Sequence, residues 1–474
     1  VSGHFQQSDP HDAPYLKLME ISDEMCKRLL HHEGLYYPLG LGPHGLVSEA
    51  LLLHMKSPAI HGALNMIYRY GITEDETYAQ KVYPYLRGVA DFWEKDLVCR
   101  DGVYHVVGDG MHERTDGNIR DNGVPENPVN TLGYLKTFFT WMPRISEALD
   151  LDEKKREKWL EIAENLAPYP KGTIREIQEN PTLWKEVDVK LEDLLPEEML
   201  DKEIYYDEGI GGKWSFHFPG NVMQIYPGNA IGLGSAPEEL EVARNTVQIH
   251  ALVENALGEL EYRKVLEEFA DKDNANNLLF NSNGELENGE VYSNGMESGG
   301  VQNPHFYKAG AFNASNLSCL FFTAAVRVGY DPKIIWKEMR DMILNRGIPN
   351  GFLKENPHGI EQLNTIPDAI QEMMLQSCEG IIRIFPVWPR AEHPNASFRN
   401  FRAWGGFEVS AALKNGEVER VTILSHKGHP CRIENPWPGK SVKVSYEYGR
   451  PDEVHFGEYL NIELHKEEHA ELVI

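Results

Sequence analysis

An acid and an amide, Glu361 and Asn364, stand directly in front of a segment with helical periodicity. With Thr365 as a candidate N-cap, the apolar residues of that segment recur at helical spacing and are Ile366, Ala369, Ile370, Met373 and Met374. A carboxylate and an amide at a helix start can exchange a proton and hold a hydroxyl group. Alternatively, Glu361 and Asp368 simply favour the positive end of the helix, where acidic side chains are common.

A second group of reactive side chains lies in the glycine-rich stretch "NGMESGGVQNPHFYKAG", residues 294–310, and comprises Glu297, Asn303, His305 and Tyr307. In a lyase that cleaves acidic polysaccharides, Asn303 would neutralise the uronate carboxylate, while His305 and Tyr307 would act as base and acid. In a hydrolase the same side chains would shape the substrate pocket. Lys308 is the one cation close by in sequence for an anionic substrate, and such spacing also arises by chance.

A third group, Trp214, His217 and Asn221, lies in a stretch that is poor in helical periodicity. Aromatic faces stack on the C–H surface of a pyranose ring, and amides satisfy sugar hydroxyl groups. These residues are therefore candidate sugar ligands. A histidine in the core and a packed tryptophan are the alternative interpretation.

Helical periodicity dominates the first 380 residues, so helices must position these side chains. Three apolar faces support helices, namely Leu18, Ile21, Met25 and Leu29; Val82, Leu86, Val89, Ala90 and Trp93; and Leu132, Leu135, Phe139, Met142 and Leu149. Ser235 begins another helix with a capping-box pattern. Further helices are predicted near residues 47–69, 153–166, 260–271, 312–329, 333–345 and 366–377. Helices in sequential pairs with long loops between them favour an α/α toroid.

From about residue 396, apolar and polar residues alternate as in β-strands instead of recurring at helical spacing. "GGFEVSAALKNGEVERVTILSH" alternates around a Lys-Asn-Gly turn and predicts a β-hairpin. "SVKVSYEYG" and "YLNIELH" are expected to extend an antiparallel sheet. Two helix-poor stretches, about 168–234 and 273–310, are rich in Gly, Asn and aromatic residues, so they predict functional loops, with a disordered linker as the alternative.

Composition narrows the class of protein. The 474 residues carry a formal charge of −27, which repels the phosphate backbone of nucleic acids, and the sequence contains no Lys/Arg cluster. Nucleic acid is therefore excluded as a partner. No apolar run is long enough to predict a membrane span. Five cysteines, without metal-ligand spacing, predict neither a disulfide framework nor a zinc site, and no other metal or cofactor is expected.

Three stretches resemble glycoside hydrolase family 95, the inverting α-L-fucosidases and their relatives. "AIQEMMLQSCEGIIRIFPVWP", followed by "FRAWGGFEVSAALKNGEVERVTILSHKGHPCRI", is similar to the family's catalytic helix, strand and hairpin. "QIYPGNAIGL" at residues 224–233 contains the Tyr-Pro-Gly-Asn turn of the family. "HMKSPAIHGALNMIYRYGITEDETYAQKVYPYLRGVADFWEKDLV" is similar to the helix pair that precedes the family's acid-bearing loop.

The resemblance implies a mainly α protein, with an (α/α)6 toroid or barrel over residues 1–390 and a small antiparallel, β-sandwich-like domain over residues 391–474. It implies an inverting, exo-acting hydrolase of an α-linked sugar, an α-L-fucoside or a related L-galactoside or neutral sugar, that degrades an oligosaccharide or polysaccharide. The family's upstream β-domain and its first barrel helices have no counterpart here, so a fragment is expected. The resemblance also favours an extracytoplasmic location.

The resemblance assigns roles to two glutamates. Inverting hydrolysis needs one carboxylic acid for the leaving oxygen and one carboxylate that activates water. Glu113, in "GVYHVVGDGMHERTDG", occupies the position of the acid, and the alternative is a solvated loop glutamate among Asp109, Arg114 and Asp116. Glu361 occupies the position of the base, with Asn364 or Gln362 holding the water molecule or a sugar hydroxyl group.

The chain also departs from the family pattern. Glu361 replaces an aspartate, and the family's Gly-Asn-Phe does not follow it. The stretch "GLYYPLGLGPHG" lacks the asparagines that help to polarise the water, and "KWSFHFPGNVM" replaces a histidine-rich segment. These departures put the fucose specificity in doubt. They keep two alternatives open, the toroid lyase and a noncatalytic carbohydrate-binding relative.

Overall fold

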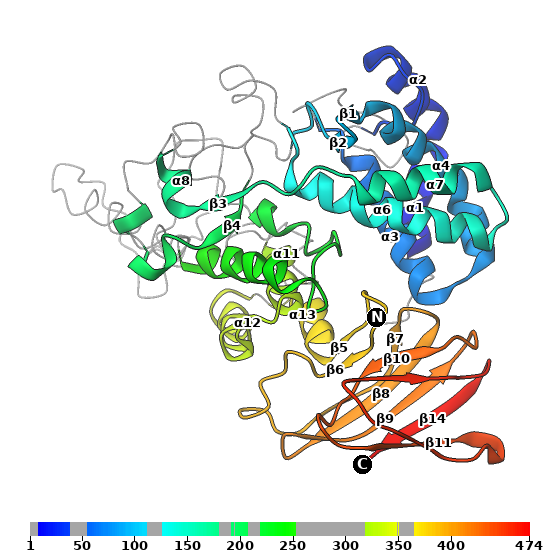
Figure 1. Ribbon diagram of the computed structural model, residues 1–474, viewed down its shortest axis with the longest axis vertical. Coiled ribbons are helices and arrows are strands. Elements are labelled where there is room, and N and C mark those ends of the chain that lie inside the picture. Colours follow the sequence, from blue (N-terminus) through cyan, green and yellow to red (C-terminus); the bar gives the residue numbers. More distant parts are fainter. Residues whose placement is uncertain are drawn as a thin grey trace.

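The computed structural model places helices first along the chain and an antiparallel sheet last (Figure 1). The residues that it describes are 8–37, 55–110, 126–179, 191–193, 195–206, 219–252, 318–347, 349 and 365–474. This arrangement confirms the prediction of a mainly helical protein with a C-terminal antiparallel sheet. None of the helices in these ranges combines the length and the hydropathy that a membrane span needs.

The N-terminal helices pack around one hydrophobic core. They are α1 (Asp9–Lys17), α2 (Met19–Leu29), α3 (Pro58–Thr73), α4 (Glu76–Asp96), α6 (Val129–Ala148) and α7 (Glu153–Glu164). Local chemistry fixes the start of α4, because the Asp75 carboxylate accepts hydrogen bonds from the backbone N–H groups of Thr77 and Tyr78. The predicted apolar faces of α4 and α6 are buried as expected.

The predicted apolar face of the first helix is partly wrong. The chain forms two helices that meet at Leu18, and Ile21 is 47% exposed. Ser22 and Cys26 are buried instead, because the break at Leu18 turns the next helix by about one residue. Ser22 satisfies its hydroxyl group by donating to the Tyr36 carbonyl oxygen at 2.7 Å.

The C-terminal helices are α11 (Ser318–Arg327), α12 (Pro332–Arg346) and α13 (Thr365–Met374), and an earlier helix spans residues 237–252. This earlier helix begins two residues after Ser235, whose hydroxyl group accepts from the Gly232 N–H instead of capping the helix. The helix predicted near 260–271 lies outside the described residues. The helix predicted from residue 47 is described from Pro58 onward.

Helices α11 and α13 run in the same direction. The Thr323 hydroxyl group donates to Asp368 Oδ2 at 3.0 Å, and one turn later Arg327 pairs with Glu372 at 2.9 Å. Both pairs span 45 residues, so the two helices are parallel and α12 returns the chain between them. Parallel inner helices joined by returning helices are what an α/α toroid requires. The complete (α/α)6 ring stays a prediction.

Helices α3 and α6 are also parallel. Near their starts the rings of His61 and Tyr134 stack at 5.6 Å, and near their ends Gly71 lies against Trp141. We call α3, α6, α11 and α13 the inner helices, because their residues are buried on most sides. The turn that contains the Tyr-Pro-Gly-Asn sequence contacts both pairs, since Thr137 of α6 donates to the Gly228 carbonyl and Arg327 of α11 donates to the Ile225 carbonyl.

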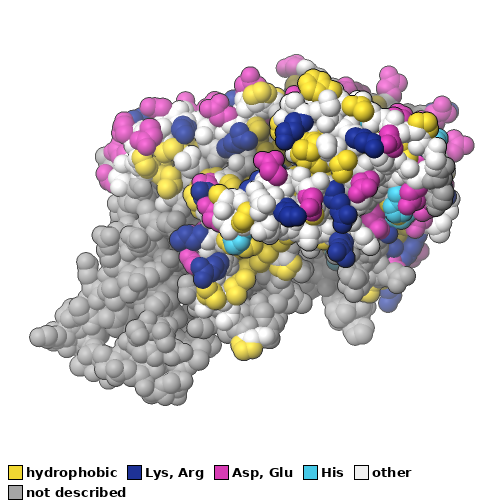
Figure 2. All heavy atoms as spheres, turned by 90° about the horizontal axis from the view of Figure 1, so that it is seen from below, with side chains coloured by type: hydrophobic (Ala, Val, Ile, Leu, Met, Phe, Trp, Pro, Cys, Tyr) yellow, Lys and Arg dark blue, Asp and Glu magenta, His cyan; other side chains and the backbone are white. Residues whose placement is uncertain are grey.

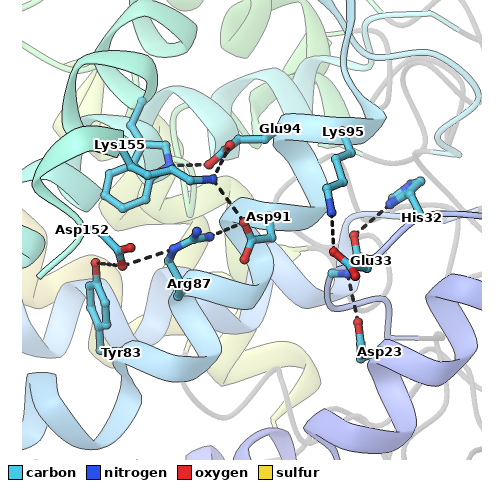
Figure 3. A network of polar contacts seen from close by, with 12 residues as sticks. Asp23, His32, Glu33, Tyr83, Arg87, Asp91, Glu94, Lys95, Asp152 and Lys155 are labelled. Carbon is cyan, nitrogen blue, oxygen red and sulfur yellow. Dashed lines mark hydrogen bonds and ion pairs between the residues drawn. The ribbon is translucent and has the colours of Figure 1, made fainter.

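Outside the inner helices, a chain of polar contacts holds α4 against α7 (Figure 3). Asp152, just before α7, accepts hydrogen bonds from the Tyr83 hydroxyl group at 2.8 Å and from Arg87 Nε at 3.2 Å. Lys155 of α7 reaches back to Glu94 of α4 at 2.8 Å. Single surface ion pairs contribute about 0–1 kcal/mol, but linked, half-buried contacts such as these fix one helix against its neighbour.

The C-terminal sheet contains β7 (Ala396–Ala403), β8 (Phe407–Lys414), β9 (Glu417–Ser425), β11 (Val442–Tyr446), β12 (Glu453–His455) and β14 (Glu468–Val473), in the order β12-β11-β14-β9-β8-β7. The predicted hairpin is confirmed, because β8 and β9 pair around Asn415 and Gly416, whose φ values of 52° and 81° are those of a two-residue turn of type I′.

On the face seen in Figure 2, acidic, basic and apolar side chains lie interspersed.

Some of the strands form smaller sheets. The stretch "YLNIELH" forms β13 (Tyr459–Ile462), which pairs with β10 (Cys431–Glu434) rather than with the main sheet, so that part of the prediction is wrong. Three more pairings are short, and their strands are β1 (Val98–Arg100) with β2 (Val103–His105), β3 (Lys171–Thr173) with β4 (Glu203–Tyr205), and β5 (Leu375–Gln376) with β6 (Arg383–Ile384). The inward side chains of the main sheet and of β10 and β13 share one core with α11–α13, which crosses the predicted domain boundary at residue 390. The division at 390 stays a prediction.

Trp404, in the turn between β7 and β8, docks the C-terminal sheet onto the helices. Its ring lies 4.9 Å from that of Trp141 and 5.6 Å from that of Tyr68. Its backbone N–H donates to Ser377 Oγ just after α13, and the next N–H, of Gly405, donates to the Gly71 carbonyl oxygen. The sheet therefore contacts α3 and α6 in their C-terminal halves and the residues just after α13.

We expect the Gly71→Ala substitution to destabilise the fold. An added Cβ atom would lie 2.4 Å from ring carbons of Trp404. Overpacking of this kind costs about 1–3 kcal/mol, against a gain of about 1 kcal/mol for alanine over glycine in a helix. Urea unfolding measures the balance. A Gly71→Ala/Trp404→Leu double variant should lose less than the sum of the two single variants, because the shorter side chain frees the space. Strict additivity would contradict this account of the docking.

Candidate active site

Most of the side chains proposed from the sequence lie outside the described residues. They are Glu113, Trp214, His217, Asn303, His305, Tyr307, Glu361 and Asn364. Their roles stay predictions. Asn221 is described and buried. Its amide nitrogen donates to the Tyr205 carbonyl oxygen at 3.0 Å, and its Oδ1 pairs with His250 Nε2, so both ends of the amide have partners within the protein.

The connectivity of the chain nevertheless relates these positions to one another. The stretch with Glu113 leads into α6, the stretch with Glu361 and Asn364 leads into α13, and the stretch with His305 leads into α11. Each is thus followed by the start of an inner helix. Since the C-terminal sheet contacts α3 and α6 in their C-terminal halves and the residues just after α13, the described side chains near the helix starts define the candidate active site.

Helix α3 presents a polar stripe in an otherwise apolar sequence. His61, Asn65 and Tyr68 are spaced so that they share one face of the helix, and His61 and Asn65 keep exposed surface while their neighbours on the helix are buried. The exposed His61 ring stacks on the Tyr134 ring, with 5.6 Å between the ring centres. Desolvation lowers the pKa of His61, so its imidazole is neutral at pH 7. Tyr68 lies toward Trp404, and its hydroxyl group donates to the Pro227 carbonyl oxygen. We call His61, Asn65, Tyr134, Tyr226 and Asp368 the inner polar surface.

Two buried polar atoms beside this surface have no hydrogen-bond partner in the described part of the chain. They are the Tyr134 hydroxyl oxygen and Gln224 Oε1. The two segments are in direct contact, because a Cβ atom on Gly133 would lie 2.6 Å from the Gln224 backbone. Leaving a buried polar atom without a partner costs about 1–3 kcal/mol. Such atoms are typical of sites where water or a ligand completes the hydrogen bonding.

Asp368 is the described carboxylate of the inner polar surface. Oδ2 of Asp368 accepts from the Thr323 hydroxyl group at 3.0 Å, and the residue is half-buried. Burial, together with a hydrogen bond to the negative Asp368, raises the pKa of Tyr226 well above its usual range, so Tyr226 stays a hydroxyl donor. A carboxylate held by two hydroxyl donors can accept a sugar hydroxyl group or orient a water molecule.

Behind Asp368 lies a buried ion pair. Arg327 donates to both oxygens of Glu372, at 2.9 and 3.3 Å, and its guanidinium group lies 4.8 Å from the centre of the Tyr226 ring. A bidentate pair fixes both side chains in one geometry. It therefore holds Tyr226 in place against α11 and α13.

Asp109, four residues before Glu113 in the chain, is a buried carboxyl group. Its oxygens accept from the Lys56 backbone N–H at 2.6 Å and from the Thr131 hydroxyl group at 2.5 Å. Asp109 thereby ties the residues before α3 to the first turn of α6. Burial raises its pKa to about 6.

Sequence reasoning overlooked the α3 stripe and Asp109 for different reasons. The spacing of His61, Asn65 and Tyr68 by four and then three residues was a visible signal of one polar helix face. Asp109 stands in a Gly-Asp-Gly context that is typical of an exposed turn, so local sequence gave no sign of its burial. In the described ranges, no group of three or more His, Cys, Asp or Glu side chains is arranged to hold a metal ion.

The comparisons with known proteins agree with the sequence resemblance. Residues 376–469 match the family model described as glycoside hydrolase family 95, C-terminal domain. The resemblance to this family is therefore confirmed, and it relates the chain to the carbohydrate-active enzymes. No curated protein matches the chain.

Three solved structures align with the chain at low similarity. An α-L-rhamnosidase from Streptomyces avermitilis has 11% identity and a TM-score of 0.35, with coverage of 98% of this chain and 36% of that one. A protein described as a kojibiose phosphorylase from the human microbiome has 10% identity and a TM-score of 0.34, with coverage of 94% and 56%. A β-arabinofuranosidase of family GH127 has 12% identity and a TM-score of 0.22, with coverage of 97% and 76%. The chain thus spans 56% or less of the length of the first two.

We expect Asp109 to give stability a pH dependence. Its pKa of about 6 lies above the ordinary 3.8, so the folded state binds this proton more tightly than the unfolded state. The free energy of unfolding should therefore fall by up to about 3 kcal/mol on account of this group as the pH rises from 4 to 7. Asp109→Asn lacks this titration, so its stability relative to the wild type should rise over that range in urea unfolding. The exposed Asp101→Asn variant is the control. A constant difference for Asp109→Asn would contradict the assignment.

Proposed function

We propose that the chain is an inverting, exo-acting glycoside hydrolase that removes an α-linked sugar, an α-L-fucoside or a related L-galactoside or neutral sugar. The observation that carries the proposal is the family 95 domain at residues 376–469, which directly follows the helix whose start carries the predicted base. In this proposal Glu113 is the general acid and Glu361 the general base.

The proposed reaction divides the chemistry between the two glutamates. Glu113 gives its proton to the leaving glycosidic oxygen, and Glu361 removes a proton from a water molecule that attacks the opposite face of the anomeric carbon. Asn364 holds the water molecule or a sugar hydroxyl group. Inversion requires the two carboxyl groups to be about 6.5–9.5 Å apart, so that the sugar and the water fit between them.

The described geometry supports two further parts of the proposal. The inner polar surface offers hydroxyl, amide and imidazole groups, which suit a neutral sugar better than a charged one. Trp404 and the sheet contact α3 and α6 in their C-terminal halves and the residues just after α13. A site that is closed at one end accepts the terminus of a saccharide, which favours exo action.

We expect Glu361→Gln to reduce kcat on the best α-linked aryl glycoside by roughly 10²-fold or more, because an amide cannot accept the proton. Glu113→Gln should lose most activity on substrates with poor leaving groups and less on activated ones. Proton NMR of the first turnover should show the β-anomer as the initial product. Release of the α-anomer would contradict inversion. If incubation with acidic polysaccharides yields a product that absorbs in the ultraviolet, and His305→Ala and Tyr307→Phe abolish that product, the reaction is elimination rather than hydrolysis.

Asp368 is the described alternative to Glu361. As a hydroxyl ligand on the inner polar surface, Asp368→Asn should raise KM by about tenfold and leave the acidic limb of the kcat profile in place. Asp341→Asn on the outer helix α12 is the matched control, because the Asp341 carboxylate pairs with Lys337 at the surface. If Asp368→Asn abolishes the acidic limb while Glu361→Gln stays active, the base role belongs to Asp368.

A further inference from the structure

A pocket of about 190 Å³ lies in the C-terminal part of the chain, separate from the inner polar surface. Two segments form its walls, residues 383–390, which comprise β6 and the turn after it, and residues 434–438, which begin at the last residue of β10. Its lining includes Arg383, Phe385, Trp388, Arg390, Glu434 and Pro436. The volume corresponds to about six water molecules, which is enough for a small ring-shaped ligand.

The walls of this pocket are held in place by the protein itself. Backbone hydrogen bonds join the two segments, from the Ile382 N–H to the Arg432 carbonyl and from the Glu434 N–H to the Ile382 carbonyl, both at 2.9 Å. Trp388 donates from Nε1 to the His393 carbonyl oxygen at 2.9 Å. A pocket whose walls are fixed before binding loses little conformational freedom when a ligand enters.

Arg390 is a cation without an acidic partner in this pocket. Its guanidinium group donates to the Phe385 carbonyl oxygen at 3.3 Å, and no carboxylate of the described residues lies within ion-pair distance. Burial lowers the pKa of Arg390, and the more distant Glu417 offsets this effect only in part. The neighbouring Arg383, by contrast, pairs with both Glu379 and Glu434.

Other described arginines, such as Arg156 and Arg244, also donate to carbonyl oxygens rather than to carboxylates. Arg390 differs from these two in that it lines a pocket. A desolvated guanidinium group without a counter-charge is costly, and an anionic ligand would remove that cost. Guanidinium groups bind carboxylates in a two-point geometry.

We propose that this pocket binds a carboxylate-bearing monosaccharide unit, a hexuronate, with its carboxylate on Arg390. Glu434, whose side chain is 47% exposed, supplies an acceptor for a sugar hydroxyl group. The ring of Trp388 and the nearby prolines supply an apolar wall for the C–H face of the sugar. The pocket is thus a binding site in addition to the candidate active site, and it does not depend on the proposed hydrolysis.

Isothermal titration of the full chain with sodium D-galacturonate tests this proposal directly, with D-galactose and sodium sulfate as comparison ligands. Galacturonate should bind, and binding should weaken as salt is added. Arg390→Gln should weaken it by at least about tenfold, because a hydrogen bond to a charged group is lost. Arg390→Lys should retain part of the affinity. Arg420→Gln, an exposed arginine on β9, should stay within twofold of the wild type.

Several results would overturn the proposal. Absence of galacturonate binding to the wild type would do so, as would equal binding by Arg390→Gln at an unchanged unfolding midpoint. If sulfate binds as tightly as galacturonate and through Arg390, the pocket is a simple oxyanion site and the sugar assignment fails. If galactose binds equally well, the carboxylate is not recognised. Because the readout is binding rather than turnover, an inactive enzyme would leave each of these results interpretable.

Discussion

The docking of Trp404 against Gly71 and Trp141 determines how the C-terminal sheet lies against the inner helices. One aromatic ring, together with backbone hydrogen bonds on either side, joins the C-terminal sheet to the ends of inner helices that are far apart in sequence. A glycine is required at position 71 because the ring occupies the space of a Cβ atom.

The inner helices and the turn between them carry polar groups that a hydrophobic core would exclude. Tyr134 and Gln224 each hold a buried polar atom without a described partner, and such atoms reduce stability. The Arg327–Glu372 pair and the contacts between α4 and α7 keep the surrounding helices fixed. Proteins commonly carry this kind of local cost at sites where a ligand supplies the missing hydrogen bonds.

Sequence periodicity predicted the helices well where one face is continuously apolar, as in α4 and α6, and it predicted the β8–β9 hairpin from its turn residues. It failed at Ile21, because a break at Leu18 changes which face is buried, and at β13, because strand pairing depends on distant residues. Sequence reasoning predicted less of the candidate active site than of the fold. Asp109 is buried by Lys56 and Thr131, which come from other segments, and no local pattern records such contacts.

A described carboxyl group lies near the start of α6 and another near the start of α13. Around the start of α6, burial raises the pKa of Asp109 to about 6, and Glu113 follows four residues later in the chain. Around the start of α13, the half-buried Asp368 carboxylate accepts a hydrogen bond from the Thr323 hydroxyl group. Inverting hydrolysis needs one carboxyl group that keeps its proton and one that has lost it. In the proposed reaction these two groups are Glu113, which precedes α6 in the chain, and Glu361, which precedes α13.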